Sequence, residues 1–161
     1  MVKQASPASD LESLLGAGCL LPPAEFAVDG LTPQAAVAPR TYEQVAEAMR
    51  YAHANGLAVI PSGGGTHMRI GNLPQRYDIA LSLARLDRVI EHEPADLTVT
   101  CQAGITLAEL QRRLAAAGQA LALDPPHGKQ ATIGGILAAN ASGPSRHAYG
   151  SARDLAIGMR V

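Results

Sequence analysis

The sequence predicts a protein of mixed α and β structure, because helix-like and strand-like segments alternate along its 161 residues. Residues 35–60 have the pattern of a strand, a helix and a second strand, which together form a βαβ unit. Residues 88–93 and 97–102 alternate polar and apolar side chains around a short turn, which predicts an antiparallel hairpin. Parallel and antiparallel strands are therefore expected in one protein.

Two helices have clear start signals. Thr41 and Gln44, and later Thr106 and Glu109, stand three residues apart before apolar stripes and have the form of capping boxes. An Asn-Gly pair should end the first helix, and the second should reach Ala117. The remaining expected strands are residues 35–38, at a sheet edge, and residues 78–83 and 120–123.

The most informative stretch is Ser-Gly-Gly-Gly-Thr at residues 62–66, directly after the apolar run 57–60. Glycines without Cβ atoms can adopt positive φ, so such a loop can turn its N–H groups toward one anion. A phosphate or pyrophosphate is the natural ligand, and a flexible surface loop is the alternative. No Lys follows the glycines and the spacing Gly-x-Gly-x-x-Gly is absent, which excludes a P-loop and a Rossmann fingerprint.

Residues 132–140 look like a short helix opened by the hydroxyl of Thr132. A helix start offers N–H groups and a partial positive charge to an anion. Gly134 and Gly135 inside this helix cost roughly 1 kcal/mol each relative to Ala. We therefore expect something flat or bulky to lie against that backbone.

The composition argues against several function classes. A net charge of −1 gives no reason to expect nucleic acid or an acidic membrane surface, and the lack of Trp argues against a base-stacking platform. No apolar run reaches 18 residues, and the N-terminus does not resemble a secretory signal. Cys19 and Cys101 have no metal-ligand spacing and fit a reduced, cytoplasmic protein. His92 lies on the polar face of its predicted strand and is expected to be solvated.

Five motifs occur in a familiar order: Pro39-x-x-Tyr-x-x-Val45, Pro61-Ser-Gly-Gly-Gly-Thr66, Asp96-Leu-Thr-Val-Thr-x-x-Ala-Gly104, Thr132-Ile-Gly-Gly135 and Tyr149-Gly-Ser-x-Arg-Asp154. Over roughly residues 31–161 this order resembles the FAD-binding domain of the vanillyl-alcohol oxidase and p-cresol methylhydroxylase (PCMH) type. The part from Asp124 onward is most similar to the FAD-binding subunit of bacterial glycolate oxidase.

The resemblance implies an α+β fold of two lobes with FAD between them. Residues 35–95 would form the first lobe, a βαβ unit, after an N-terminal segment of residues 1–34. Residues 96–161 would begin a second lobe of antiparallel strands and helices, and that lobe would be truncated at its end.

Carried over residue by residue, the resemblance implies that the glycine loop wraps the pyrophosphate and that the later segments lie against the ribityl chain and the flavin. The implied cofactor-binding residues are Ser62, Gly63, Gly64, Gly65, Thr66, His67, Asp124, Pro125, Thr132, Gly134, Gly135, Asn140, Ser142, Gly143, Tyr149 and Gly150. Gly64→Val or Gly135→Val should abolish FAD binding. Members that link FAD covalently carry Arg-Ser-Gly-Gly-His, where this chain has Gly65 at the linking position, so non-covalent FAD is expected. His127 would point at the ligand or cap a turn.

The implied function is the FAD-binding portion of a flavin-dependent oxidoreductase acting on a 2-hydroxy acid such as glycolate, with the flavin taking a hydride equivalent. The implied partners are a second flavoprotein subunit and an iron–sulfur subunit. No catalytic or metal-binding residue is assigned, because no acid–base or nucleophilic constellation is present. Two alternatives stay open. One is a non-catalytic module that binds FAD weakly or not at all and serves in subunit assembly, with an unpaired sheet edge that a partner, or a second copy of the chain in a homo-oligomer, could complete. The other is a domain that binds a different nucleotide or phosphate compound and has no redox role.

Overall fold

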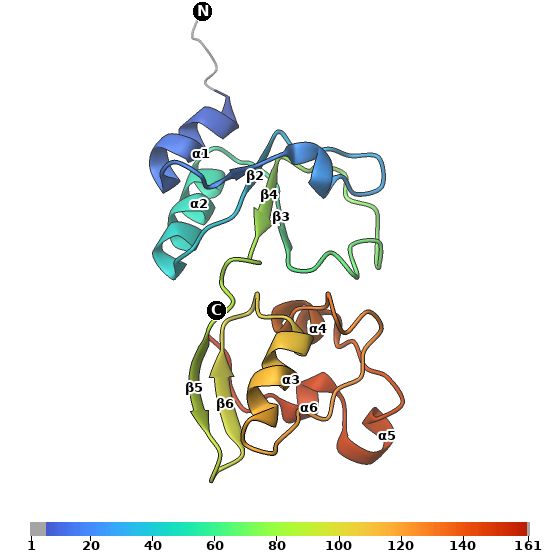
Figure 1. Ribbon diagram of the computed structural model, residues 1–161. Coiled ribbons are helices and arrows are strands. Elements are labelled where there is room, and N and C mark those ends of the chain that lie inside the picture. The colour runs from blue at the N-terminus through green and yellow to red at the C-terminus, as the bar shows by residue number, and fades with distance from the viewer. Residues whose placement is uncertain (1–5, 161) are drawn as a thin grey trace, which may run out of the picture. The chain divides into compact units, whose positions relative to one another are not determined.

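A computed structural model of the protein describes residues 6–160, which form two compact units (Figure 1). The first unit extends to Ser62 and resumes from Met68 to Arg85, and the second consists of Gly63–His67 and the chain from Leu86 onward. Both contain helices and strands, which confirms the α+β prediction. The division at residue 85, and not at 95, leaves the whole hairpin in the second unit, and the glycine loop belongs to that unit too.

A four-stranded sheet of order β1-β2-β4-β3 forms the centre of the first unit. Its strands are β1 (Leu20–Leu21), β2 (Ala35–Val37), β3 (Val59–Ser62) and β4 (Ile79–Ser82). β4 pairs in parallel with both β2 and β3, and β1 pairs antiparallel with the other side of β2. The prediction of an edge strand at residues 35–38 is therefore wrong, because the N-terminal segment folds back and occupies the free side of β2.

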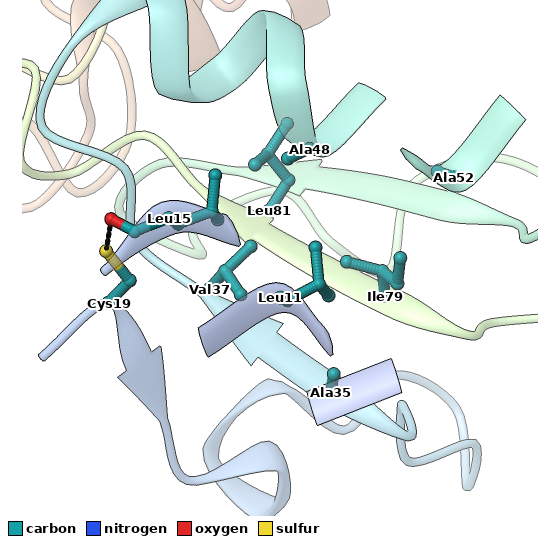
Figure 2. Packing of buried hydrophobic residues seen from close by; sticks show 9 residues of the cluster. All are labelled: Leu11, Leu15, Cys19, Ala35, Val37, Ala48, Ala52, Ile79 and Leu81. Atoms are coloured by element: carbon teal, nitrogen blue, oxygen red, sulfur yellow. Dashed lines mark hydrogen bonds between the residues drawn. The ribbon is translucent and has the colours of Figure 1, made fainter. Parts of the chain in front are cut away.

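Two helices cover one face of this sheet. α2 (Tyr42–Ala54) connects β2 to β3 and completes the predicted βαβ unit, and α1 (Pro7–Leu15) packs beside it. Figure 2 shows the core that they enclose with side chains of β2 and β4. The buried members of this core are Leu11, Leu15, Cys19, Ala35, Val37, Ala48, Ala52, Ile79 and Leu81. Alternate strand residues, such as Ala36 and Ala80, face the opposite side, where they pack with Val28 and Tyr77.

The predicted cap of α2 is present. Thr41 Oγ1 accepts a hydrogen bond from the Gln44 backbone N–H at 3.3 Å. The Gln44 side-chain oxygen in turn accepts from the backbone N–H of Arg40 at 2.7 Å, one residue before the position that a capping box uses. The Thr41 half of the predicted capping box is therefore present, and the Gln44 half is shifted by one residue to Arg40.

Asp78 joins three segments of the first unit at the start of β4. Its carboxylate accepts from the Ala58 backbone N–H at 2.7 Å, from Gln34 Nε2 at 2.9 Å and from the Arg76 guanidinium at 2.6 Å. The Ala58 N–H is the largest influence on the pKa of Asp78 and lowers it, and the bonds from Arg76 and Gln34 lower it further against the opposing effect of burial. The side chain is only 10% exposed, so solvent screens these interactions little.

Replacing Asp78 by asparagine should lower the free energy of unfolding at neutral pH by about 1–3 kcal/mol, because asparagine has no charge and offers one acceptor oxygen where the two carboxylate oxygens serve three donors. A carboxyl whose pKa is lowered by folding stabilises the fold above its unfolded pKa of about 3.9 and loses that contribution as the pH falls through the folded value. The gap between the native protein and Asp78→Asn in urea unfolding should therefore narrow below about pH 4. Asp87→Asn, a change at an exposed carboxylate, is the control. A gap that stays constant with pH would contradict this role.

The second unit contains a hairpin and a set of short helices. Its elements are β5 (Val89–Glu93), β6 (Thr98–Cys101), α3 (Leu107–Ala115), α4 (Ile133–Ala139), α5 (Arg146–Tyr149) and α6 (Ala152–Leu155). β5 and β6 pair antiparallel, which confirms the predicted hairpin. α3 buries its stripe Leu107, Leu110 and Leu114, and the last two pack with Ile105 and with side chains of the hairpin. Among residues 6–160, no helix combines the length and the apolar character needed to cross a membrane.

Three local predictions in this unit need correction. The second capping box forms only in part. Thr106 Oγ1 accepts from the Glu109 N–H, but the Glu109 carboxylate pairs with Arg112 and Arg113 and not with the Thr106 N–H. α3 ends at Ala115, two residues before the predicted end. Residues 120–123 form no strand, because the Gln111 side chain bonds both the N–H and the carbonyl of Leu121. His92 is half-buried and contacts the Gln119 side-chain oxygen through Nε2 at 2.9 Å, so it is not simply solvated.

Candidate functional site

The glycine loop, Gly63–His67, leaves β3 and lies against the segment that leads into α4. A Cβ atom on Gly63 would overlap the Thr132 side chain, and one on Gly64 would overlap the carbonyl oxygen of Gln130. Gly65 has φ of +70°, a conformation that other residues rarely adopt. The three glycines are therefore required by the packing and the backbone conformation of the loop itself.

The loop leaves its backbone donors free. Within the part of the chain that the structure describes, the N–H groups of Gly63, Gly64, Gly65, Thr66 and His67 donate to no acceptor. The side chains of Thr66 and His67 hydrogen bond to each other through Oγ1 and Nδ1 at 2.9 Å. Successive unpaired N–H groups around a residue of positive φ are the arrangement in which proteins bind anions.

The start of α4 differs from its prediction, although Thr132 is the N-cap as expected. The N–H of Ile133 donates to the Ile105 carbonyl at 2.9 Å, and the N–H of Gly134 donates to the Ala103 carbonyl at 2.8 Å. The N–H of Gly135 donates to Thr132 Oγ1 at 3.3 Å. These donors already have protein partners, so the prediction that the helix start offers N–H groups to an anion is wrong.

The two glycines of α4 stand in different surroundings. A Cβ atom on Gly134 would lie 2.7 Å from Ala103 Cβ and 2.9 Å from the Ala103 carbonyl oxygen. On Gly135, Thr132 Oγ1 at 3.2 Å is the one neighbour within 4 Å in the described chain, apart from the residues beside it and the backbone of its own helix. A bulky neighbour was expected at both glycines. At Gly134 that neighbour is Ala103, in the same unit. Gly135 keeps a backbone surface that a ligand can approach.

The turn after α4 is held from two sides. Asn140 ends the helix at φ of +45°, and its side-chain oxygen accepts from the Arg153 N–H at 3.3 Å. Farther along, the Asp124 carboxylate accepts from the Ser145 N–H, with its two oxygens at 3.1 and 3.3 Å. Partial desolvation raises the pKa of Asp124, but the donors of Ser145 and Gly143 outweigh it and hold the pKa below its ordinary value. Between these anchors, the Ser142 hydroxyl is buried and has no hydrogen-bond partner.

The other expected site residues are placed less tightly. The backbone carbonyl of His127 accepts from the N–H groups of Gln130 and Ala131, so the main chain of His127 closes the turn before α4 while its side chain is exposed. Pro125 is buried, and Tyr149 is 62% exposed. Ser62 belongs to the first unit, where its hydroxyl is also buried without a partner.

Two residues that support the site escaped the sequence prediction. The Gln130 carbonyl contacts the glycine loop. Ala103 packs against Gly134, and its carbonyl accepts a hydrogen bond from the Gly134 N–H. Ala103 is part of the Ala-Gly motif after β6, but nothing in that motif names Gly134 as its partner. Among residues 6–160, no group of three or more His, Cys, Asp or Glu side chains is placed to hold a metal ion.

Features within the second unit fit an extended dinucleotide such as FAD. The glycine loop offers unpaired donors beside the start of α4, and Ser142 offers an unpaired hydroxyl beyond its end. The seven residues of α4 span about 10 Å at 1.5 Å per residue. One elongated ligand with an anionic part and a polar ring system could meet both groups.

Comparison with known proteins agrees with this geometry. The family described as "FAD binding domain" matches residues 33–161. Mitochondrial D-2-hydroxyglutarate dehydrogenase of Bos taurus is 37% identical over 76% of this chain and 23% of its own length. The glycolate oxidase subunit GlcD of Bacillus subtilis is 28% identical over 80% of this chain and 27% of its own length. The chain thus spans about a quarter of the length of these curated relatives.

Solved structures share the fold. An alkyldihydroxyacetonephosphate synthase aligns with a TM-score of 0.70 and 30% identity, covering 78% of this chain and 26% of that one. p-Cresol methylhydroxylase aligns with a TM-score of 0.71 over 84% of this chain and 29% of that one. Its 18% identity supports the fold alone, and the predicted PCMH-type fold is confirmed.

Proposed function

We propose, from the premise that this chain belongs to the FAD binding domain family, that it is the FAD-binding portion of an oxidoreductase that acts on a 2-hydroxy acid. The observation that carries the proposal is the set of unpaired N–H groups at Gly63–His67, held in place by Gln130 and Thr132. The relatives support the substrate class: D-2-hydroxyglutarate dehydrogenases, a glycolate oxidase subunit and the D-lactate dehydrogenase [cytochrome] 1 of Saccharomyces cerevisiae all carry 2-hydroxy acids in their names.

In this proposal FAD supplies the hydride-accepting chemistry, and the residues of the chain bind and orient it. The N–H groups of the glycine loop hold the diphosphate. Gly135 allows close approach along α4, and the Ser142 hydroxyl bonds a polar atom of the cofactor. The further residues proposed to line FAD are Ser62, Pro125, Thr132, Asn140, Gly143, Tyr149 and Gly150.

Non-covalent attachment of FAD is part of the proposal. Gly65 has no side chain through which a flavin could be linked, and His67 Nδ1 is engaged with Thr66 Oγ1. Denaturation with acid should therefore release all flavin into the supernatant. The word "subunit" in the name of the GlcD relative supports an assembly with other subunits for the whole protein. A cytoplasmic location is a further part of the proposal.

A second candidate is an FAD-dependent synthase. The alkyldihydroxyacetonephosphate synthase of Dictyostelium discoideum is 30% identical over 80% of this chain and 22% of its own length. The two candidates share the same FAD site and differ in the substrate that meets the flavin. Bleaching of the flavin spectrum by a 2-hydroxy acid in the absence of air would favour the oxidoreductase.

The visible spectrum of the purified chain tests the proposed cofactor directly. After incubation with FAD and desalting, the protein should keep flavin absorbance at about one flavin per chain. Riboflavin, which has no diphosphate for the glycine loop, should be lost on the same column. A protein that stays colourless with FAD, while its circular dichroism shows a folded state, would overturn FAD binding by this chain.

A further inference from the structure

Asp124 is tied to the turn at residues 142–145 through both its main chain and its side chain. Its carboxylate accepts from the Ser145 N–H, and its carbonyl oxygen and Oδ1 lie so close to Gly143 that no Cβ atom would fit there. The other end of the turn is fixed by the Ala141 N–H, which donates to the Ile136 carbonyl at 2.9 Å. The conformation of Ser142 is therefore set from both sides.

Ser142 itself has an unmet hydrogen-bonding need. Among the described residues of the second unit, its Oγ is the only buried side-chain nitrogen or oxygen that lacks a partner. A buried hydroxyl without a partner costs about 1–3 kcal/mol, a cost that proteins accept mostly where a ligand or a water molecule supplies the missing bond. Because the turn is anchored at both ends, Ser142 cannot relieve this cost by a small shift of its backbone.

We propose that Asp124 is a positioning residue: it holds the 142–145 turn so that the Ser142 hydroxyl meets a polar atom of FAD, and it makes no contact with FAD itself. This inference rests on the proposed function. It assigns Asp124 a different role from the cofactor-lining one expected from the sequence, because both carboxylate oxygens are already directed to the Ser145 N–H.

A double-mutant cycle measured on the affinity for FAD tests this role. Ser142→Ala should weaken FAD binding about 2- to 12-fold, the range of one hydrogen bond of about 0.5–1.5 kcal/mol. Asp124→Ala should weaken binding by at least as much. The double variant should bind no worse than Asp124→Ala alone, because Asp124 acts on FAD only through Ser142. Asp124→Asn keeps one oxygen for the Ser145 N–H and should restore most of the affinity.

Two further measurements separate positioning from a general structural role. Ser142→Ala should leave the free energy of unfolding of the FAD-free chain unchanged or raise it, because it removes an unpaired buried hydroxyl. Asp154→Ala also removes a carboxylate that accepts backbone and side-chain bonds, here from Ser151, and its effect on FAD affinity should add to that of Ser142→Ala. Should Asp124→Ala fail to fold, Ser145→Pro takes its place in the cycle, because it removes the N–H from which the Asp124 carboxylate accepts and the φ of Ser145, −57°, suits proline.

Losses from Asp124 and Ser142 that add in the double variant would overturn the inference, because Asp124 would then act independently of Ser142. Unchanged FAD affinity in Ser142→Ala would also overturn it, and would indicate that a water molecule, and not FAD, forms the missing hydrogen bond of the Ser142 hydroxyl. Both results leave the proposed function intact as long as the native chain binds FAD. A native chain that does not bind FAD overturns the proposed function and this inference with it.

Discussion

Gly64→Ala should weaken FAD binding by at least about a hundredfold, which corresponds to roughly 2.7 kcal/mol. The added Cβ would overlap the Gln130 carbonyl oxygen, a backbone atom that cannot rotate away. Either the loop or the segment before α4 must move, and the N–H groups of Gly63–His67 then no longer point as the native loop directs them. The affinity for FAD is measured by titration of the flavin fluorescence. Gly64→Val, with a larger side chain at the same place, should do no better.

Gly65→Ala is the matched control for this prediction. A Cβ atom at Gly65 meets no atom within 4 Å in the described chain, but the residue has φ of +70°. The left-handed conformation costs an alanine roughly 1–2 kcal/mol, so affinity should fall about 5- to 30-fold at most. Both variants should keep the circular dichroism spectrum of the native chain. Equal affinities for FAD in Gly64→Ala and Gly65→Ala would remove the Gln130 contact from the explanation.

Alanine at Gly134 should destabilise the protein, whereas alanine at Gly135 should not, although the two residues are neighbours in one helix. In Gly134→Ala the Cβ must enter a space that Ala103 already fills, and overpacking of this kind costs about 1–3 kcal/mol. The movement of α4 also strains the bond from the Gly134 N–H to the Ala103 carbonyl. The gain in helix propensity, about 1 kcal/mol, offsets only part of this cost.

In Gly135→Ala the same propensity gain meets only the contact with Thr132 Oγ1, so the free energy of unfolding should stay the same or rise by up to about 1 kcal/mol. If FAD lies along α4 as proposed, this variant should nevertheless bind FAD more weakly. Urea unfolding without FAD and flavin titration give the two quantities independently. A stable Gly135→Ala protein with native FAD affinity would remove Gly135 from the proposed contacts, and equal destabilisation by both substitutions would contradict the role of Ala103.

Local signals were sufficient to predict several elements from the amino-acid sequence. The hydroxyl caps at Thr41, Thr106 and Thr132 are all formed, because a cap joins atoms three residues apart. The hairpin follows from alternation within two short runs. The order of the glycine-containing motifs is sufficient to predict the fold and the FAD-binding family.

The hydrogen-bond partner of each backbone group, in contrast, depends on contacts between distant parts of the chain. Gly134 donates to Ala103, thirty-one residues earlier, and Asp124 accepts from Ser145, twenty-one residues later. Residues 120–123 form no strand because the Gln111 side chain on α3 bonds the backbone of Leu121. β2 is not an edge strand because β1 pairs with it. Each backbone group can be satisfied by any donor or acceptor that the fold brings near, so a local pattern shows that a partner is needed and not which residue supplies it.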